Sequence, residues 1–296
     1  MHRFGKTSQT PVTDTPTTRF APSPTGPLHL GHAYSALTAH DRAQSAGGRM
    51  LLRIEDIDTA RSKPEWEAQI FDDLAWLGLD WPRPVLRQSV RRPAYDAALD
   101  RLGVMGVIYP CRCRRADIRA ALSAPQAGAP VHGPDGLVYP GTCRDRPMAA
   151  AGAQDAIRLN MGAALDRIGR MLPTFRETGP LHGGLHRLDA TALIKGVGDV
   201  VLARRDIGTS YHMAVVVDDA FQGITEVVRG ADLFEATQIH VLLQALLGLP
   251  TPAYHHHRLI TDDTGKRLAK RDDARALATY RAEGATPAAI RRMIGL

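Results

Sequence analysis

The sequence has few cysteines and no long apolar run, and each of these absences excludes a class of protein. Three cysteines among 296 residues, an odd number, argue against a secreted disulfide framework and favour a reducing, cytoplasmic compartment. No segment approaches the roughly 18 uninterrupted apolar residues that a membrane span needs. Residues 1–18 are polar and lack the apolar stretch of a signal peptide. We therefore predict a cytoplasmic protein with a flexible leader at 1–18.

The rest of the composition is that of an ordinary folded protein. Hydrophobic residues make up 44% and charged residues 23% of the chain, which is far from the signature of a disordered protein. Basic residues number 37 against 31 acidic ones, for a net charge of +6. Such an excess permits a polyanionic partner such as RNA, but it does not establish one.

The order of predicted elements indicates an α/β fold with a parallel sheet. A short strand at 17–21 runs into a Pro- and Gly-rich turn, a helix follows at 29–46, and a buried strand occupies 49–54. Strand, helix, strand is the repeating unit of a doubly wound sheet. We also predict a central strand at 213–217 and loop-rich chain from Pro250, and the remaining predicted helices lie at 64–78 and 236–247.

The most informative segment is Arg19-Phe20-Ala21-Pro22-Ser23-Pro24-Thr25-Gly26-Pro27-Leu28-His29-Leu30-Gly31-His32. It places His29 and His32 three residues apart at the start of a helix, so both imidazoles face the same side of its first turn. The unpaired N–H groups and the dipole at a helix start attract phosphate. Gly31 has no side chain, so a base or ribose can approach the backbone closely. Two solvated histidines are the alternative interpretation.

A second basic motif lies near the C-terminus. Residues 265–271, Gly-Lys-Arg-Leu-Ala-Lys-Arg, hold four cations in seven positions, enough to neutralise a triphosphate and a pyrophosphate leaving group. A solvated surface run is the alternative.

Together the two motifs resemble the HIGH and KMSKS signatures of class I aminoacyl-tRNA synthetases, in the form used by glutamyl enzymes. The second motif departs from the family pattern, with Arg267 for the first lysine and Ala269 for the serine, but it keeps Lys270. The resemblance implies that Lys270 stabilises charge on the phosphates. It further implies catalytic roles for His29, His32 and Lys270, and an ATP site formed by His29, Gly31, His32, Arg267 and Lys270.

Residues between the two motifs suit an amino acid with two carboxylates. Glu55 follows a strand and can accept hydrogen bonds from an ammonium group, whereas Arg19 and Arg229 can bind carboxylates. Tyr211 adds a hydroxyl. Glutamine would leave one guanidinium without its charge partner, so we favour glutamate. This set resembles the glutamate pocket of glutamyl synthetases, and the match is carried by Arg19, Phe20, Ala21, Pro22, Ser23, Glu55, Tyr211 and Arg229.

The cysteines fall as Cys111-x-Cys113 and Cys143 in a Pro- and Gly-rich segment. Clustered thiols in a small insertion predict a structural zinc site, which needs a fourth ligand. Chemistry alone favours His132, because imidazole is the commoner partner. The resemblance to glutamyl-queuosine enzymes favours Tyr139, so both stay open. The adjacent histidines at 255–257 are interpreted as loop, because neighbouring side chains diverge.

The ending of the chain refines the family. Only 25 residues follow Arg271, too few for the anticodon-binding domain of a glutamyl-tRNA synthetase. The resemblance, over about 19–277, is therefore to glutamyl-queuosine tRNA(Asp) synthetases. It implies ATP-dependent glutamate activation, with Mg²⁺ on the phosphates, and transfer to queuosine in the anticodon loop of tRNA(Asp). Charging of the tRNA 3′ end, another nucleotidyl transfer and a non-catalytic RNA-binding role are the alternatives.

The same resemblance implies how the chain is divided. A Rossmann-like catalytic domain would occupy 19–108 and 191–260, split by an inserted zinc-containing subdomain at 109–190. The KMSKS-like loop and a short helical extension would occupy 261–296. No membrane and no protein partner is expected. We expect the RNA phosphates to contact a basic surface formed by Arg87, Arg91, Arg92 and the arginines of 112–119.

Overall fold

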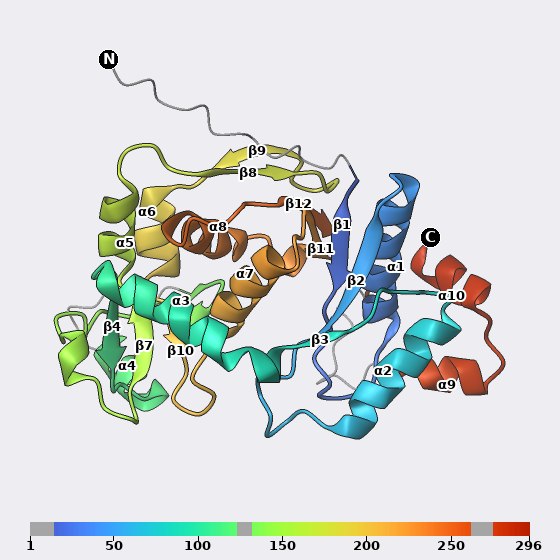
Figure 1. The fold of residues 1–296 in the computed structure, drawn as a ribbon, viewed down its shortest axis with the longest axis horizontal. Helices are drawn as coiled ribbons and strands as arrows, with labels where there is room; N and C mark the ends of the chain where they lie inside the picture. Colours follow the sequence, from blue (N-terminus) through green and yellow to red (C-terminus); the bar gives the residue numbers. More distant parts are fainter. Residues whose placement is uncertain (1–14, 123–131, 262–274) are drawn as a thin grey trace, which may run out of the picture.

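The computed structural model describes residues 15–122, 132–261 and 275–296, and two sheets form its centre (Figure 1). They meet where the Thr225 N–H donates to the Thr17 carbonyl at 2.9 Å. The strands of the first sheet are all parallel, and those of the second are parallel except for its last pair. In sheet order they are β1 (Thr17–Phe20), β2 (Arg49–Ile54) and β3 (Leu86–Arg87), then β11 (Glu226–Gly230), β12 (Ala253–His257), β8 (Thr174–Glu177) and β9 (Gly184–Arg187).

The β1–α1–β2 unit has the predicted order. Strand β1 begins at Thr17, two residues inside the predicted leader, and α1 spans Leu30–Ser45. Gly47 ends α1 with a φ of 69°, a left-handed conformation that glycine adopts without strain. A Cβ on Gly48 would lie 2.0 Å from the Pro16 carbonyl oxygen. The Gly47–Gly48 pair therefore both ends the helix and lets β2 start directly beside the chain that leads into β1.

Helices α2 (Pro64–Trp76), α9 (Leu277–Ala282) and α10 (Pro287–Ile294) complete the N-terminal half (Figure 1). Arg291 of α10 forms an ion pair with Asp41 of α1 at 2.6 Å. Leu277 and Ile290 are buried in the same hydrophobic cluster as Leu37 of α1. The C-terminal helices thus supply part of the core that α1 and α2 form against β1 and β2.

The predicted strand at 213–217 is wrong, because this segment lies in helix α7 (Tyr211–Phe221). Ser210 caps the helix by accepting from the Met213 N–H at 3.3 Å. Residues Met213 to Val216 are all buried, and a short continuous apolar run of this kind fits a buried helix as well as a buried strand. Helix α7 packs in the second hydrophobic cluster with α3 (Arg92–Val104), α5 (Met161–Ile168) and α8 (Thr237–Leu246).

The chain from β4 to β10 (108–203), which is called the inserted chain below, contributes a third, antiparallel sheet at the other end of the molecule (Figure 1). Strands β8 and β9 pair with the second sheet, whereas β10 pairs with β7. The third sheet contains β4 (Ile108–Cys111), β7 (Ala156–Leu159) and β10 (Val201–Ala203). Near it lie α4 (Arg115–Leu122) and the hairpin β5 (His132–Gly133) and β6 (Gly136–Leu137).

Short helical turns connect these elements. The turns are η1 (Gln88–Arg91), η2 (Met148–Ala150), α6 (Ala190–Ala192), the π-helical η3 (Leu193–Val197) and η4 (Ala231–Leu233).

In the described part of the chain no helix is long and apolar enough to span a membrane.

Candidate active site

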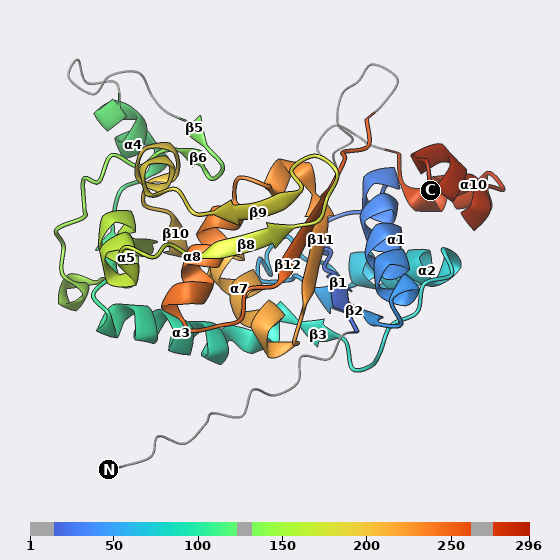
Figure 2. The same ribbon diagram turned by 90° about the horizontal axis from the view of Figure 1, so that it is seen from above.

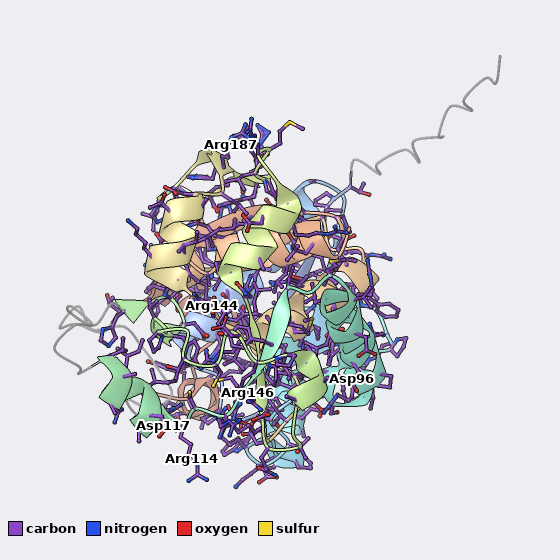
Figure 3. The ribbon with its side chains drawn as sticks, turned by 90° about the vertical axis from the view of Figure 1, so that its left-hand side faces the viewer. Asp96, Arg114, Asp117, Arg144, Arg146 and Arg187 are labelled. Atoms are coloured by element: carbon purple, nitrogen blue, oxygen red, sulfur yellow. The ribbon has the colours of Figure 1, made fainter. Side chains whose placement is uncertain are left out.

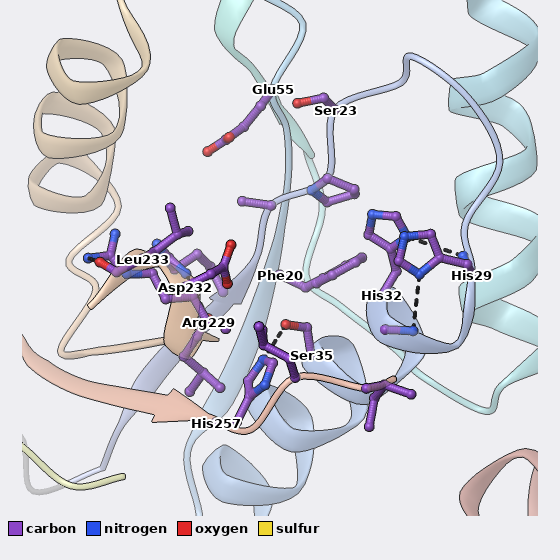
Figure 4. Close-up of a pocket in the computed structure, with 18 of the residues that line it drawn as sticks. Phe20, Ser23, His29, His32, Ser35, Glu55, Arg229, Asp232, Leu233 and His257 are labelled. Atoms are coloured by element: carbon purple, nitrogen blue, oxygen red, sulfur yellow. Dashed lines mark hydrogen bonds between the residues drawn. The ribbon is translucent and has the colours of Figure 1, made fainter. Parts of the chain in front are cut away.

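A cavity of about 570 Å³ opens where β1, β2, β11 and β12 end (Figure 4). The carboxyl ends of parallel strands are where α/β sheets bind ligands. The structure brings to this cavity every described residue that the sequence predicted for glutamate or ATP, whereas Arg267 and Lys270 lie outside the described residues. The lining includes Arg19, Phe20, Ala21, Pro22, Ser23, His29, Gly31, His32, Glu55, Tyr211 and Arg229.

The two imidazoles lie on one side of the cavity and Arg229 on the other (Figure 4). The His29 and His32 ring centres are 3.8 Å apart. His29 is the N-cap of α1: its Nδ1 accepts from the Gly31 N–H, and the His29 N–H donates to His32 Nδ1, each at 3.1 Å. Two N–H groups expected to be available to phosphate are therefore already bonded to the imidazoles. A Cβ on Gly31 would lie 3.0 Å from the His29 ring.

Two buried arginines share one carboxylate beside the cavity. Asp219 Oδ1 accepts from Arg19 Nε at 3.0 Å and from Arg53 at 2.6 Å. A second bond from Arg19 at 3.4 Å makes that contact bidentate. Burial alone would raise the pKa of Asp219, but the two guanidinium charges outweigh it and lower the pKa. Arg19, predicted to bind a substrate carboxylate, is thus already oriented by a carboxylate of the protein.

Glu55 is held by Arg53 at 3.1 Å, with its side chain 10% exposed. Burial raises the pKa of Glu55, and the charges of Arg53 and Arg19 oppose the rise. A substrate ammonium group next to Glu55 would favour its ionised form. Sequence reasoning missed the site roles of Arg53 and Asp219. Arg53 lies in a predicted strand, and Asp219 follows the run 213–217, which is also predicted as a strand.

Arg229, near the end of β11, has neutral acceptors. Its Nε donates to His256 Nε2 at 3.0 Å, and one terminal nitrogen contacts His240 Nδ1 at 3.0 Å. Weaker bonds reach the Tyr211 hydroxyl at 3.4 Å and the Leu233 carbonyl at 3.2 Å. The remaining acceptor is the Thr237 hydroxyl at 2.8 Å. Unlike Arg19 and Arg53, Arg229 contacts no carboxylate among the described residues. Its five N–H groups are all engaged, so an incoming carboxylate would replace the two longest bonds, to Tyr211 and Leu233.

The histidines at 255–257 form strand β12, so their interpretation as loop is wrong. His256 pairs in register with Arg229, and His257 with Gly230. His257 lines the cavity and lies 2.5 Å from the Ser35 hydroxyl. Burial, more than any other cause, lowers the pKa of His256 and His257. Three adjacent histidines carry no alternating apolar pattern, which is why sequence reasoning missed this strand.

The three cysteines come together in the inserted chain. The Cys111, Cys113 and Cys143 sulfurs all lie within 4.8 Å of one another, and Cys113 and Cys143 are 3.5 Å apart. The Tyr139 hydroxyl lies 3.4 Å from Cys111 and 3.3 Å from Cys113. His132 lies in β5 with an exposed side chain. Of the two candidate fourth ligands, the structure therefore places Tyr139 at the thiols.

The donor set suits a thiophilic cation. Burial alone would raise the pKa of Cys143, but hydrogen bonds, first from Tyr139, lower it to about 7. Thiolates are the form that binds metal. Ion pairs from Arg144 to Asp199 at 2.8 Å and from Arg146 to Asp155 at 2.9 Å hold the chain after Cys143. Figure 3 shows both arginines on the side of the molecule that carries the inserted chain.

Three of the arginines expected to contact RNA phosphates are engaged in ion pairs. Arg87 pairs with Glu67, Arg91 with Asp218 at 3.0 Å and Arg92 with Asp96 at 2.7 Å. Their charge is thus locally balanced. Arg115 and Arg119 are exposed on α4.

Comparison with known proteins places this geometry in a family. The family model described as tRNA synthetases class I (E and Q), catalytic domain, matches residues 16–135 and 189–296. The chain is 64% identical over 282 residues to a Rhodobacter capsulatus protein named glutamyl-Q tRNA(Asp) synthetase, covering 94% of this chain and 99% of that protein. A Nocardia farcinica protein of the same name is 44% identical over 271 residues, or 91% of this chain and 80% of its own length.

Solved structures show the same fold. Glutamate-tRNA synthetase from Elizabethkingia anophelis superposes with a TM-score of 0.74 at 28% identity, covering 95% of this chain. A glutamate tRNA ligase from Elizabethkingia meningosepticum, solved in complex with its amino acid, gives 0.74 at 29% identity and also covers 95% of this chain. The chain spans 61% and 60% of those two solved chains.

The buried histidines of β12 predict a loss of stability in acid. Burial, followed by the Arg42 charge, lowers the pKa of His255 to about 4 from 6.5. The unfolded chain therefore binds this proton first as the pH falls. The stabilisation is complete above about pH 6.5 and disappears between about pH 6.5 and pH 4, at a cost of roughly 2–3 kcal/mol. Urea unfolding of the wild type across this range should show the decline. The pH dependence should be smaller in His255→Gln and unchanged in the exposed control His182→Gln, and equal slopes in all three would contradict this assignment.

Proposed function

Because the chain belongs to the class I tRNA synthetases (E and Q), whose catalytic-domain model it matches, we propose that it activates L-glutamate with ATP and transfers the glutamyl group to queuosine in tRNA(Asp). The predicted resemblance to glutamyl-queuosine enzymes is confirmed by the relatives that carry the name glutamyl-Q tRNA(Asp) synthetase. The chain is accordingly a ligase of the aminoacyl-tRNA synthetase type. The observation that carries the choice of glutamate is Arg229, a buried guanidinium with neutral acceptors in the cavity.

Activation joins two anions, glutamate and ATP. We place the groups that bind them on opposite walls of the cavity. A carboxylate oxygen of glutamate attacks the α-phosphorus of ATP, and pyrophosphate leaves. We assign the side-chain carboxylate to Arg229 and the ammonium group to Glu55, on the wall opposite the imidazoles. His29 and His32 would donate to the phosphates at the start of α1, where the helix dipole also favours negative charge. Lys270 and Arg267, from the sequence motif, would bind the pyrophosphate.

Mg²⁺ would neutralise the triphosphate when bound, as in other transfers of phosphoryl groups. The adenylate is a mixed anhydride, so a hydroxyl that is correctly placed can attack its carbonyl carbon and release AMP. The choice of acceptor thus depends on how RNA docks. The names of the relatives favour the queuosine of tRNA(Asp), and the 3′ terminal ribose is the alternative.

We further propose that Cys111, Cys113, Tyr139 and Cys143 bind a structural zinc ion. Three thiols and one phenol oxygen within contact distance of each other provide four donors, and structural zinc is usually four-coordinate. The ion would stabilise a segment whose own hydrophobic cluster is small.

Substitutions in the two motifs test the role of the imidazoles and of Lys270. His29→Asn keeps a good N-cap acceptor but removes the imidazole, so the fold should persist while glutamate-dependent exchange of pyrophosphate into ATP falls about 10²–10³-fold. Lys270→Ala should give a loss of similar size. Exchange is measured without tRNA, and the melting temperature is the control for folding. Near-normal exchange in a folded Lys270→Ala variant would remove that lysine from the mechanism.

Zinc content tests the thiol cluster. The purified protein should carry about one zinc ion per chain, and Cys143→Ser should carry much less. Tyr139→Phe should lose metal to a chelator faster than the wild type, whereas His132→Ala should match the wild type. Elemental analysis and a chelator-competition assay measure both quantities. Equal zinc content in the wild type and Cys143→Ser would rule out this site. If only His132→Ala lost zinc faster than the wild type, His132 and not Tyr139 would be the fourth ligand.

The acceptor is tested with labelled glutamate and tRNA(Asp) that either contains or lacks queuosine. Label should enter only the queuosine-containing tRNA and should stay on the anticodon-arm fragment after nuclease cleavage. Oxidising the 3′ ribose with periodate, while the queuosine diol is protected, should not reduce incorporation. Charging of queuosine-free tRNA at its 3′ end would instead establish ordinary synthetase activity.

A further inference from the structure

The hydrogen bonds of Arg229 continue beyond the cavity as a line of buried side chains. Arg229 contacts His240 Nδ1 at 3.0 Å, and His240 Nε2 lies 3.0 Å from His212 Nδ1. His212 Nε2 then lies 3.5 Å from a carboxylate oxygen of Asp135. The two histidines and Arg229 are at most 6% exposed, whereas the Asp135 side chain is 45% exposed. A path of three contacts thus joins the cavity to a surface carboxylate.

Arginine fixes the direction of both hydrogen bonds along this line. A guanidinium only donates hydrogen bonds, so His240 Nδ1 must accept and its proton must lie on Nε2. His212 Nδ1 therefore accepts from His240, and its own proton lies on Nε2, facing Asp135. Burial, followed by the Arg229 charge, lowers the pKa of His240 well below its usual value, which keeps that imidazole neutral. Only one arrangement of protons satisfies the whole line.

A second arm holds Arg229 from the other side. Its Nε donates to His256 Nε2, so the His256 proton lies on Nδ1, which is 2.5 Å from Glu177. Hydrogen bonding from His256 helps lower the pKa of Glu177 to about 2, against the opposing effect of burial. Arg229 is therefore oriented by two carboxylates that act through neutral imidazoles, and neither carboxylate contacts it directly.

The hairpin that carries Asp135 is docked closely on the rest of the chain. Asp135 lies in the turn of the hairpin that β5 and β6 form (Figure 2). Strand β5 packs against η3. A Cβ on Gly133 would lie only 2.0 Å from the Gly196 carbonyl oxygen, and one on Gly198 would lie 2.7 Å from Val138. These close approaches hold the turn at a fixed position over His212.

We propose that Asp135, His212 and His240 are positioning residues for Arg229, through which the β5–β6 hairpin sets the affinity and selectivity for the side-chain carboxylate of the substrate. This inference rests on the proposed function, since it takes glutamate as that substrate. A guanidinium binds a carboxylate best when its plane is oriented for two parallel hydrogen bonds. Each terminal nitrogen of Arg229 makes one of the two longest bonds, to Tyr211 and to Leu233, and the substrate carboxylate would replace these two. An amide presents one acceptor only, so a rotated guanidinium loses more with glutamate than with glutamine.

Two matched pairs of variants test the line. Asp135→Ala removes the terminal acceptor, whereas Asp135→Asn keeps an oxygen there. His240→Leu breaks the line, whereas His240→Gln supplies one acceptor and one donor. In pyrophosphate exchange, the KM for glutamate should rise roughly 3-fold in Asp135→Ala and about 10-fold in His240→Leu, with kcat little changed. The Asn and Gln variants should recover most of the loss, and the preference for glutamate over glutamine should fall in parallel.

Asp166→Ala, which removes an exposed acid on α5, is the control and should behave as the wild type. A purely structural role would give equal defects in each matched pair, or a fall in kcat with KM unchanged, and either result would overturn the proposal.

Nitrogen NMR of the histidine rings gives a readout that is independent of activity. The wild type should show a neutral His240, with a proton on Nε2 of both His240 and His212, and Asp135→Ala should shift the His212 signals more than those of His256. Another tautomer at His240, or no response to Asp135→Ala, would overturn the line of hydrogen bonds itself. Wild-type protein with these tautomers but without glutamate-dependent exchange would instead overturn the proposed function and with it the assigned substrate.

Discussion

The cavity depends on a single shared carboxylate. Asp219 comes from α7, and its two partners, Arg19 and Arg53, come from the neighbouring strands β1 and β2. All three side chains are almost fully buried, and a buried charge that loses its partner typically costs about 3–5 kcal/mol. A substitution that removes the charge of any one of the three alone therefore disrupts this buried network. The contact also joins segments about 200 positions apart, so it holds the two halves of the cavity wall in register.

That arrangement divides the cationic groups by task. Arg19 and Arg53 are neutralised within the protein by Asp219 and Glu55, and they give the wall its shape. Arg229 is held by imidazoles, a phenol, a hydroxyl and a carbonyl. Among the described residues no carboxylate contacts Arg229, so its charge attracts an anionic substrate. The cavity thus obtains rigidity from one set of arginines and selectivity from another.

Motifs at strand ends could be predicted from the sequence, because residue type and turn chemistry are local. The helix start at His29 and the residues after β1 and β2 were identified in this way. The missing parts depended on tertiary packing. The run at 213–217 is apolar on all sides, so its periodicity could not distinguish helix from strand, and Asp219 was misplaced with it. The histidines of β12 and the role of Arg53 became evident only from the side chains that surround them.

The packing of α9 and α10 on α1 also affects how the chain folds during synthesis. The Leu277 N–H donates to the Leu28 carbonyl at 2.8 Å, and Ile290 and Ile294 fill the core around α1. These residues are synthesised after all the others that the structure describes. Domains generally begin folding during synthesis, from the N-terminal side. The β1–α1–β2 unit, although made first, therefore keeps part of its hydrophobic face uncovered until α9 and α10 have been synthesised.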